Sequence, residues 1–392
     1  MRVRLIAPAA LLWSVTALGG EWSGYVSGEV RVFPLSPLDH RQDGNNLSLA
    51  AQPEYFHDFA DSQRVSFTPF LRWDQHDDQR THADIRELLW SKAAEQWELR
   101  AGIGKVFWGV TESQHLVDII NQTDLVEDPD GEDKLGQPMV NLALIRDWGT
   151  VNLFVLPGFR ERTFPGVDGR LRSQPYVDTD HPLYQSSAED KHVDYAARWS
   201  HYLGDWDMGL SYFHGTSRDP RLVLDTSGSV PVLRPYYDLI NQTGLDLQAT
   251  LDSWLWKLEV IHRTGQGDSY TAYTGGFEYT FVGVLESAAD VGVIAELLHD
   301  SRGSTAPTPF EGDLMLGARL TLNDVQSTEL LMGVIADQND SPRTYRLEAS
   351  RRLGESWKLS LEGQAFTGIP AGDLLYGYRR DNYLQLELAR YF

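Results

Sequence analysis

Apolar and polar residues alternate strictly over long runs of this chain. In 245–251, Leu and Ala residues occupy every other position, and Asp, Gln and Thr stand between them. The same period of two returns in 64–73, 313–322 and 358–366. In a β-strand a period of two sends successive side chains to opposite faces. Each run therefore predicts a strand with one apolar face and one polar face.

Two folds use such strands: a β-sandwich, and a membrane barrel whose apolar face contacts lipid. Sandwich strands have about 5–6 residues, whereas a tilted strand that spans a bilayer needs about 9–11. Because most of the runs have the greater length, we expect an all-β fold: a single transmembrane antiparallel β-barrel of about 18 strands, with 16 as the alternative. The expected strands are 22–33, 46–56, 64–74, 82–92, 96–107, 138–146, 149–156, 191–202, 206–216, 240–251, 254–264, 269–281, 288–299, 312–322, 327–337, 343–352, 357–367 and 378–392.

The connections between these strands alternate in length. Short turns are expected on the periplasmic side, and the long connections 108–137, 157–190 and 217–239 on the extracellular side. Several strands begin with a tryptophan next to a short turn. Indole favours the headgroup level of a membrane, so these residues are expected to form an aromatic girdle at one rim. They are Trp97, Trp148, Trp206, Trp254 and Trp357.

The two ends of the chain indicate its compartment. Arg2 and Arg4 precede an apolar run, and small residues follow, which is typical of a secretory signal peptide over 1–19, with cleavage expected after Gly19 or Gly20. The barrel is then expected to cover 20–392 in the outer membrane of a Gram-negative bacterium, in contact with its lipid and lipopolysaccharide. The carboxy-terminal Phe392 ends an alternating run. This ending resembles the signal that the outer-membrane barrel assembly machinery recognises, so that machinery is an expected partner.

Composition excludes several classes of protein. The formal net charge of −22 argues against a nucleic-acid partner. The chain has no cysteine, so disulfides and thiolate-held zinc or haem are excluded. We expect no cofactor and no metal.

The segment "KVFWGVTESQHLVDIINQTDLVEDPDGED" (105–133) interrupts the alternation. It contains an aliphatic patch, Leu116 to Ile120, which would be unusual in a loop surrounded by water. We expect 109–136 to fold inward, so that this patch packs on the barrel wall and acidic side chains narrow the channel; a solvated surface loop is the alternative. The carboxylates expected near the permeation path are Asp118, Asp124, Glu127, Asp128, Asp130, Glu132 and Asp133.

The polar face of each strand is expected to line the lumen, because a charged Arg or Lys facing lipid costs about 2–4 kcal/mol near the midplane. A solvated or salt-bridged wall explains these charges without a function, and those nearest a constriction are candidates for selectivity. The basic pore-lining candidates are Lys105, Arg64, Arg72, Arg86, Arg100, Arg198, Arg263, Arg319 and Arg346.

Three other segments contain residues that could bind an ion or take part in catalysis. The run 127–133 resembles half of a calcium loop but lacks its last ligands, which favours a plain acidic turn. The run 73–84 crowds Asp and His at an extracellular rim, as a hydrolase or a divalent ion site could. No G-x-S-x-G motif is present, and we expect no catalytic residues. Arginines in 160–172 are candidates for binding lipopolysaccharide phosphate or an anionic solute.

The sequence "DIINQTDL" at 118–125 returns as "DLINQTGL" at 238–245. In both copies the Asn and Thr side chains are expected to cap a turn where the chain enters the wall.

Around "RAGIGKVFWG" (100–109), "DIINQTD" (118–124) and "FVLPGFRERTFPG" (154–166), the chain resembles proteobacterial outer-membrane porin-like β-barrel families. The alginate-export barrels are related in architecture. The resemblance departs from the family pattern at Gln122, where Pro is frequent, and it implies the passage of solutes through the outer membrane. By position it marks as family features Lys105, Trp108, Gly109, Asn121, Asp124, Pro157 and Arg160.

The sequence thus predicts an outer-membrane porin-like channel, not an enzyme, for the passive passage of small hydrophilic solutes, with an acidic constriction loop at 109–136. A polysaccharide export conduit and a rim-active outer-membrane hydrolase are the alternatives.

Overall fold

The computed structural model describes residues 20–338 and 341–392. The expected signal peptide, 1–19, lies outside the described residues. Among the residues that are described, no helix combines the length and the apolar character needed to cross a membrane.

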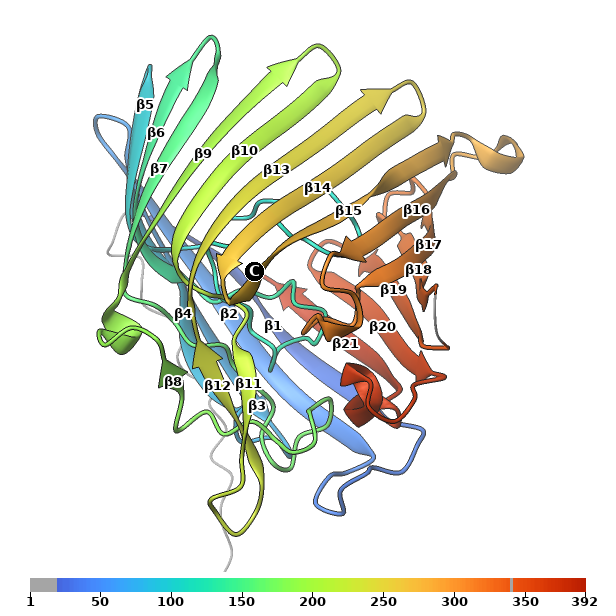
Figure 1. Ribbon diagram of the computed structural model, residues 1–392. Coiled ribbons are helices and arrows are strands. Elements are labelled where there is room, and N and C mark those ends of the chain that lie inside the picture. Colours follow the sequence, from blue (N-terminus) through green and yellow to red (C-terminus); the bar gives the residue numbers. More distant parts are fainter. Residues whose placement is uncertain (1–19, 339–340) are drawn as a thin grey trace, which may run out of the picture.

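Eighteen antiparallel strands form one closed barrel (Figure 1). Each strand pairs with its neighbours in the chain, and the first strand, β1, pairs with the last, β21, which closes the cylinder. The expected fold class and strand count are therefore confirmed. The barrel strands are β1 (Glu21–Val32), β2 (Asn45–Phe59), β3 (Gln63–Asp74), β4 (His82–Ala94), β5 (Trp97–Gly104), β6 (Gln137–Arg146), β7 (Gly149–Pro157), β9 (Val193–Leu203), β10 (Trp206–Thr216), β13 (Leu239–Leu251), β14 (Trp254–Gly265), β15 (Gly267–Phe281), β16 (Asp290–Asp300), β17 (Gly312–Thr321), β18 (Glu329–Asp337), β19 (Arg343–Leu353), β20 (Trp357–Thr367) and β21 (Tyr383–Tyr391).

Most strand boundaries lie within two residues of the expectation, and three differ by more. The second strand, β2, extends to Phe59 and not to residue 56. The last strand begins at Tyr383 and not at residue 378, because Leu374–Tyr378 form a short 3₁₀ helix, η4, whose first turn is capped by the Asp373 carboxylate. The strand expected over 96–107 ends at Gly104. The chain leaves the wall there and enters the long connection that interrupts the alternation.

The two ends of the barrel differ as expected (Figure 1). One end, the short-turn end, carries connections such as 60–62 and 252–253, and the other, the long-loop end, carries 105–136 and 158–192. The five girdle tryptophans all lie at the short-turn end. Trp97, Trp206, Trp254 and Trp357 are the first residues of β5, β10, β14 and β20, and Trp148 directly precedes β7.

Apolar and polar residues alternate along the barrel strands, so the outer face of the wall is apolar and the inner face is polar. On β21, Leu384, Leu386 and Leu388 are exposed on the outer surface, next to the exposed valines of β1. Glu29 and Arg31, which alternate with those valines, are buried inside the barrel. The outer surface is thus an apolar band that can contact lipid, and the charges lie inside.

A small second sheet at the long-loop end was not expected. It contains β8 (Leu183–Tyr184), β11 (Arg221–Asp225) and β12 (Val232–Tyr237), and it lies within connections that were interpreted as plain loops. The hairpin of β11 and β12 projects beyond the barrel (Figure 1). The remaining short elements are the 3₁₀ helices η1 (Glu189–Lys191), η2 (Val284–Glu286) and η3 (Gly303–Thr305).

Candidate functional site

The connection 105–136, called here the lumen loop, is closed at its base by one side chain. The Asn121 Oδ1 atom accepts a hydrogen bond of 2.8 Å from Val106 N. Its Nδ2 group donates to the carbonyl oxygens of Gly104 at 2.9 Å and Leu135 at 2.8 Å. Asn121 therefore caps the point where the chain leaves the wall, as expected. The repeated copy is different, since Asn241 lies inside β13.

The aliphatic patch of the lumen loop packs on the inner wall of the barrel. Val117, Ile119 and Ile120 are at most 2% exposed. Gly244 of β13 makes room for this contact, because a Cβ atom there would lie 3.2 Å from Val117 Cγ1. The loop therefore folds inward. The wall residues of this cluster come from β6 to β15 and are Met139, Phe154, Leu156, Ala196, Phe213, Ile240, Ile261, Tyr270 and Ala272.

Two carboxylates of the wall hold the backbone of the lumen loop. Glu259 of β14 is fully buried and accepts hydrogen bonds from Val110 N at 2.7 Å, Thr111 N at 3.1 Å, Thr111 Oγ1 at 2.8 Å and Val117 N at 3.1 Å. Glu296 of β16 accepts from Glu112 N at 2.8 Å and from Ser113 N at 2.9 Å. Buried N–H groups need acceptors, and the wall supplies them here.

The acidic side chains of the loop meet the arginines of the wall. All of these residues except Glu112 are site candidates from the sequence, which gives no sign that they pair. Such buried pairs fix geometry, since breaking one leaves an uncompensated charge. The pairs are Asp124 with Arg86 at 2.6 Å, Glu127 with Arg72 at 2.7 Å, Glu112 with Arg319 at 2.7 Å, and Asp130 with Arg346.

The other four arginines among the pore-lining candidates pair elsewhere. Two of them, Arg64 and Arg100, lie near the short-turn end and bind carboxylates of the same or the adjacent strand. Their distance from the loop makes them poor candidates for setting its charge. The pairs are Arg64 with Asp58, Arg100 with Glu98, Arg198 with Asp246, and Arg263 with Asp219.

Three further candidates lie within the lumen loop. Asp118 is paired with Lys134 at 3.3 Å, and burial raises the pKa of its carboxyl group. Asp128 is also buried, and burial together with nearby carboxylates raises its pKa. Lys105 borders the smaller of the two cavities described below. Their part in permeation stays a prediction.

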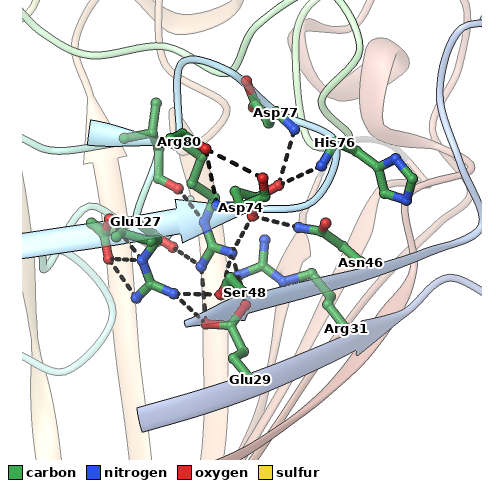
Figure 2. A network of polar contacts seen from close by, with 12 residues as sticks. Glu29, Arg31, Asn46, Ser48, Asp74, His76, Asp77, Arg80 and Glu127 are labelled. Carbon is green, nitrogen blue, oxygen red and sulfur yellow. Dashed lines mark hydrogen bonds and ion pairs between the residues drawn. The ribbon is translucent and has the colours of Figure 1, made fainter. Parts of the chain in front are cut away.

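Arg80 makes a further set of contacts that hold the lumen loop, and the sequence does not predict them (Figure 2). The guanidinium of Arg80 binds the Glu29 carboxylate of β1 through two hydrogen bonds of 2.8 and 2.9 Å. Its Nε atom donates to the Val126 carbonyl oxygen of the lumen loop at 2.8 Å. Arg80 thereby ties the loop to β1. The sequence places Arg80 in an acidic hairpin and gives no hint of contacts with residues 29 and 126.

In the acidic run 127–133 and the rim hairpin 73–84, carboxylates make hydrogen bonds and ion pairs that stabilise the fold. In 127–133, Asp130 N donates to Asp128 Oδ1 at 2.9 Å and Glu132 N to Asp130 Oδ1 at 2.8 Å, which are the bonds of acidic turns. In the rim hairpin, Asp74 binds Arg80 at 3.0 Å, and Asp77 accepts from Gly166 N at 3.0 Å. These carboxylates are occupied by structural bonds.

The arginines of 160–172 are also paired. Rather than standing free for a phosphate group, they fasten loop 158–182 over the long-loop end of the barrel. Their partners are Asp84 for Arg160, Asp219 for Arg162, Asp381 for Arg170 and Asp39 for Arg172. Gln122, at the position where the related families often have Pro, contacts the same segment, since its Nε2 group donates to the Arg160 carbonyl oxygen at 3.3 Å.

Within 20–338 and 341–392, one group of side chains could hold a metal ion. Ligand atoms of His82, Asp124 and Glu127 lie within 4.8 Å of one another. Both carboxylates, however, already face an arginine, Arg86 or Arg72. The two guanidinium groups compensate the negative charge that would attract a cation.

In the described part of the barrel, two cavities larger than 200 Å³ border the lumen loop. The larger, called here the main chamber, has a volume of about 760 Å³ and lies between the loop and the inner wall of β14 to β19. The smaller, of about 220 Å³, lies beside β1 to β4, β20 and β21. Segment 127–133 separates them, since Glu127 and Asp128 border the smaller cavity and Asp130 the main chamber.

A histidine of the lumen loop should make its docking depend on pH. Burial opposes a charge on His115, but the carboxylates of Glu132 and Glu259, each 3.8 Å from a ring nitrogen, outweigh it and raise its pKa to about 9. A raised pKa stabilises the docked loop fully below about pH 6.5, the ordinary value, and the stabilisation is lost as the pH rises through 9. We expect a loss on the order of 2 kcal/mol.

The measurement is the mobility of a spin label attached at Gln114. Mobility should increase between pH 8 and 10 in the parent protein, and His115→Gln should remove this step. A step that persists unchanged in His115→Gln would assign it to another group.

Comparisons with known proteins give fold neighbours only. No protein-family model and no curated protein sequence matches the chain. Among solved structures it is similar to Wzi of Escherichia coli, an outer-membrane protein involved in group 1 capsule assembly and described as a carbohydrate-binding β-barrel, with a TM-score of 0.56, 9% identity, and coverage of 96% of this chain and 85% of that one. It is also similar to OccK8 (OprE) of Pseudomonas aeruginosa, with a TM-score of 0.54, 10% identity, and coverage of 95% and 98%. The chain therefore has the fold of outer-membrane porin-like barrels.

Proposed function

We propose that this porin-like barrel lies in the bacterial outer membrane and lets small hydrophilic solutes pass through its lumen, with the lumen loop as the constriction. The observation that carries the proposal is a closed barrel with an apolar outer band and a charged interior that still contains a chamber of about 760 Å³. Such a wall separates lipid from a polar path.

The pairing of charges changes what the constriction is expected to select. Four loop carboxylates face wall arginines, so these four present compensated pairs and not free negative charges. A compensated constriction selects by size and by local contacts more than by the sign of the charge. The polysaccharide export alternative would need an excess of unpaired arginine in the constriction. Because the arginines that face the loop are paired with carboxylates, this alternative is weakened too.

Planar-bilayer recording of the refolded protein tests the proposal. We expect stable ohmic current steps, and only weak preference between potassium and chloride because the loop charges are compensated. The control is the same detergent preparation without the protein. Persistently silent bilayers with correctly folded barrels would contradict passage of solutes.

A second candidate is a barrel that binds a solute without conducting it. It is favoured by the number of places at which the lumen loop is held, since β3, β4, β14, β16, β17 and β19 all supply partners. Carbohydrate binding, which is described for Wzi, is one such activity. Silent bilayers combined with measurable binding of a solute would favour this candidate.

A further inference from the structure

One stretch of the wall of the main chamber, on β16 to β18, is apolar, although it faces the interior of a membrane barrel. Ile294, Leu298 and Met315 form a buried cluster on the inner face of β16 and β17, and Leu331 and Ile335 of β18 pack against it. Met315, Leu331 and Ile335 border the chamber directly. A water-filled lumen is expected to be lined by polar side chains. Within the part of the chain that the structure describes, the stripe therefore borders open space on its chamber side.

The stripe continues onto the loops above it. Phe310, from the connection between β16 and β17, packs on the same cluster and borders the chamber. Tyr378 of η4 and Phe164 of loop 158–182 lie on the chamber wall as well. On the opposite side the lumen loop contributes Leu116. Apolar groups from separate segments thus converge on one space.

The charges around this space cancel in pairs. Arg319 binds Glu112, and Arg346 binds Asp130, at the two borders of the apolar stripe. Arg302 binds Asp300 and also stacks on the Tyr270 ring, 3.3 Å from its centroid. The chamber therefore offers no net charge to a solute. What it offers is apolar surface beside hydrogen-bonding groups held in fixed positions.

The geometry points to a binding site for an uncharged amphipathic organic molecule, one that carries an aromatic ring or short aliphatic portion next to a polar portion. A volume of about 760 Å³ lies in the range of small-molecule sites, which are mostly apolar with a few placed polar groups. The apolar portion would cover Leu331 and Ile335, and the polar portion would face the ion pairs. This inference rests on the proposed function only in placing the chamber on the solute's path, since binding itself requires no current.

The test compares phenyl β-D-glucopyranoside with methyl β-D-glucopyranoside, which differ only in the apolar group. Binding is measured by saturation-transfer NMR on the full chain in lipid nanodiscs, with empty nanodiscs subtracted. We expect the phenyl compound to bind about tenfold more tightly or better, as burial of one ring provides. Equal affinities for the two compounds would overturn the inference, whether or not the barrel conducts.

Variants locate the site. Leu331→Asn combined with Ile335→Asn should reduce the preference for the phenyl compound at least about fivefold. Ser360→Asn, which adds the same amide group in the smaller cavity, should leave it unchanged. A preference that survives in the double variant would overturn the site.

A second measurement serves if the double variant does not fold. The chain has no cysteine, so Leu331→Cys introduces a single thiol that a water-soluble methanethiosulfonate can modify. The phenyl compound should slow this modification and the methyl compound should not. Identical rates with both compounds would also overturn the inference.

Discussion

Replacement of residues 109–136 by a short Gly-Ser linker is expected to raise the single-channel conductance roughly two- to fourfold, since conductance follows the open cross-section of a barrel. The loop fills the lumen on the side of β6 to β15, where its aliphatic patch packs, and it separates the two cavities. Its removal merges these spaces. Strand pairing does not involve the loop, so the barrel itself should still close.

The matched control shortens another connection at the same end. Residues 226–231, the tip of the hairpin between β11 and β12, project away from the barrel (Figure 1), and their removal should leave the conductance as it was. If the loop variant folds and its conductance equals that of the parent protein, the loop is not the constriction.

Substitution of Glu259 by Leu should release the lumen loop from the wall. The buried carboxylate accepts from three backbone N–H groups and one hydroxyl group, and each buried N–H group left without an acceptor costs about 1–3 kcal/mol. We expect docking to weaken by about 3 kcal/mol or more. Trypsin should then cleave after Lys134 roughly 100-fold faster, because cleavage follows the population of the open loop.

Two further variants serve as controls for this measurement. Glu259→Gln keeps one acceptor oxygen and should cleave at an intermediate rate. Glu98→Leu removes a lumenal carboxylate that binds Arg100 near the short-turn end and should cleave like the parent protein. Equal cleavage rates for Glu259→Leu and the parent would show that the other contacts of the loop hold it without Glu259.

The barrel could be predicted from the sequence because its evidence is local. Alternation in each strand, tryptophan at the start of β10 or β14, and the lengths of the turns are all visible within about ten residues. The hairpin of β11 and β12 escaped notice because both strands are short and lie outside the barrel. The start of β21 was misplaced because Leu374 to Tyr378 resemble a strand in composition, although Asp373 caps them as a 3₁₀ helix.

The site was predictable only in part. An aliphatic patch in a loop indicated burial, and the wall covers it. Which carboxylate meets which arginine could not be predicted, because partners such as Asp130 and Arg346 are 216 residues apart and their contact depends on the curvature of the closed wall. The contact between Arg80 and Glu29 could not be predicted for the same reason. The number of charged residues in the loop could therefore be read from the sequence, but the arginines that pair with its carboxylates could not.

The pairing of an early loop with late strands has a consequence for biogenesis. Glu112 and Asp130 depend on Arg319 and Arg346, which belong to β17 and β19, and these strands are synthesised some 200 residues later. A nascent barrel that still lacks its last strands offers the loop only the partners on earlier strands, so complete seating must follow closure of the cylinder. An intermediate stalled during insertion would carry the loop unseated, and resistance to cleavage after Lys134 would mark the moment at which each molecule is complete.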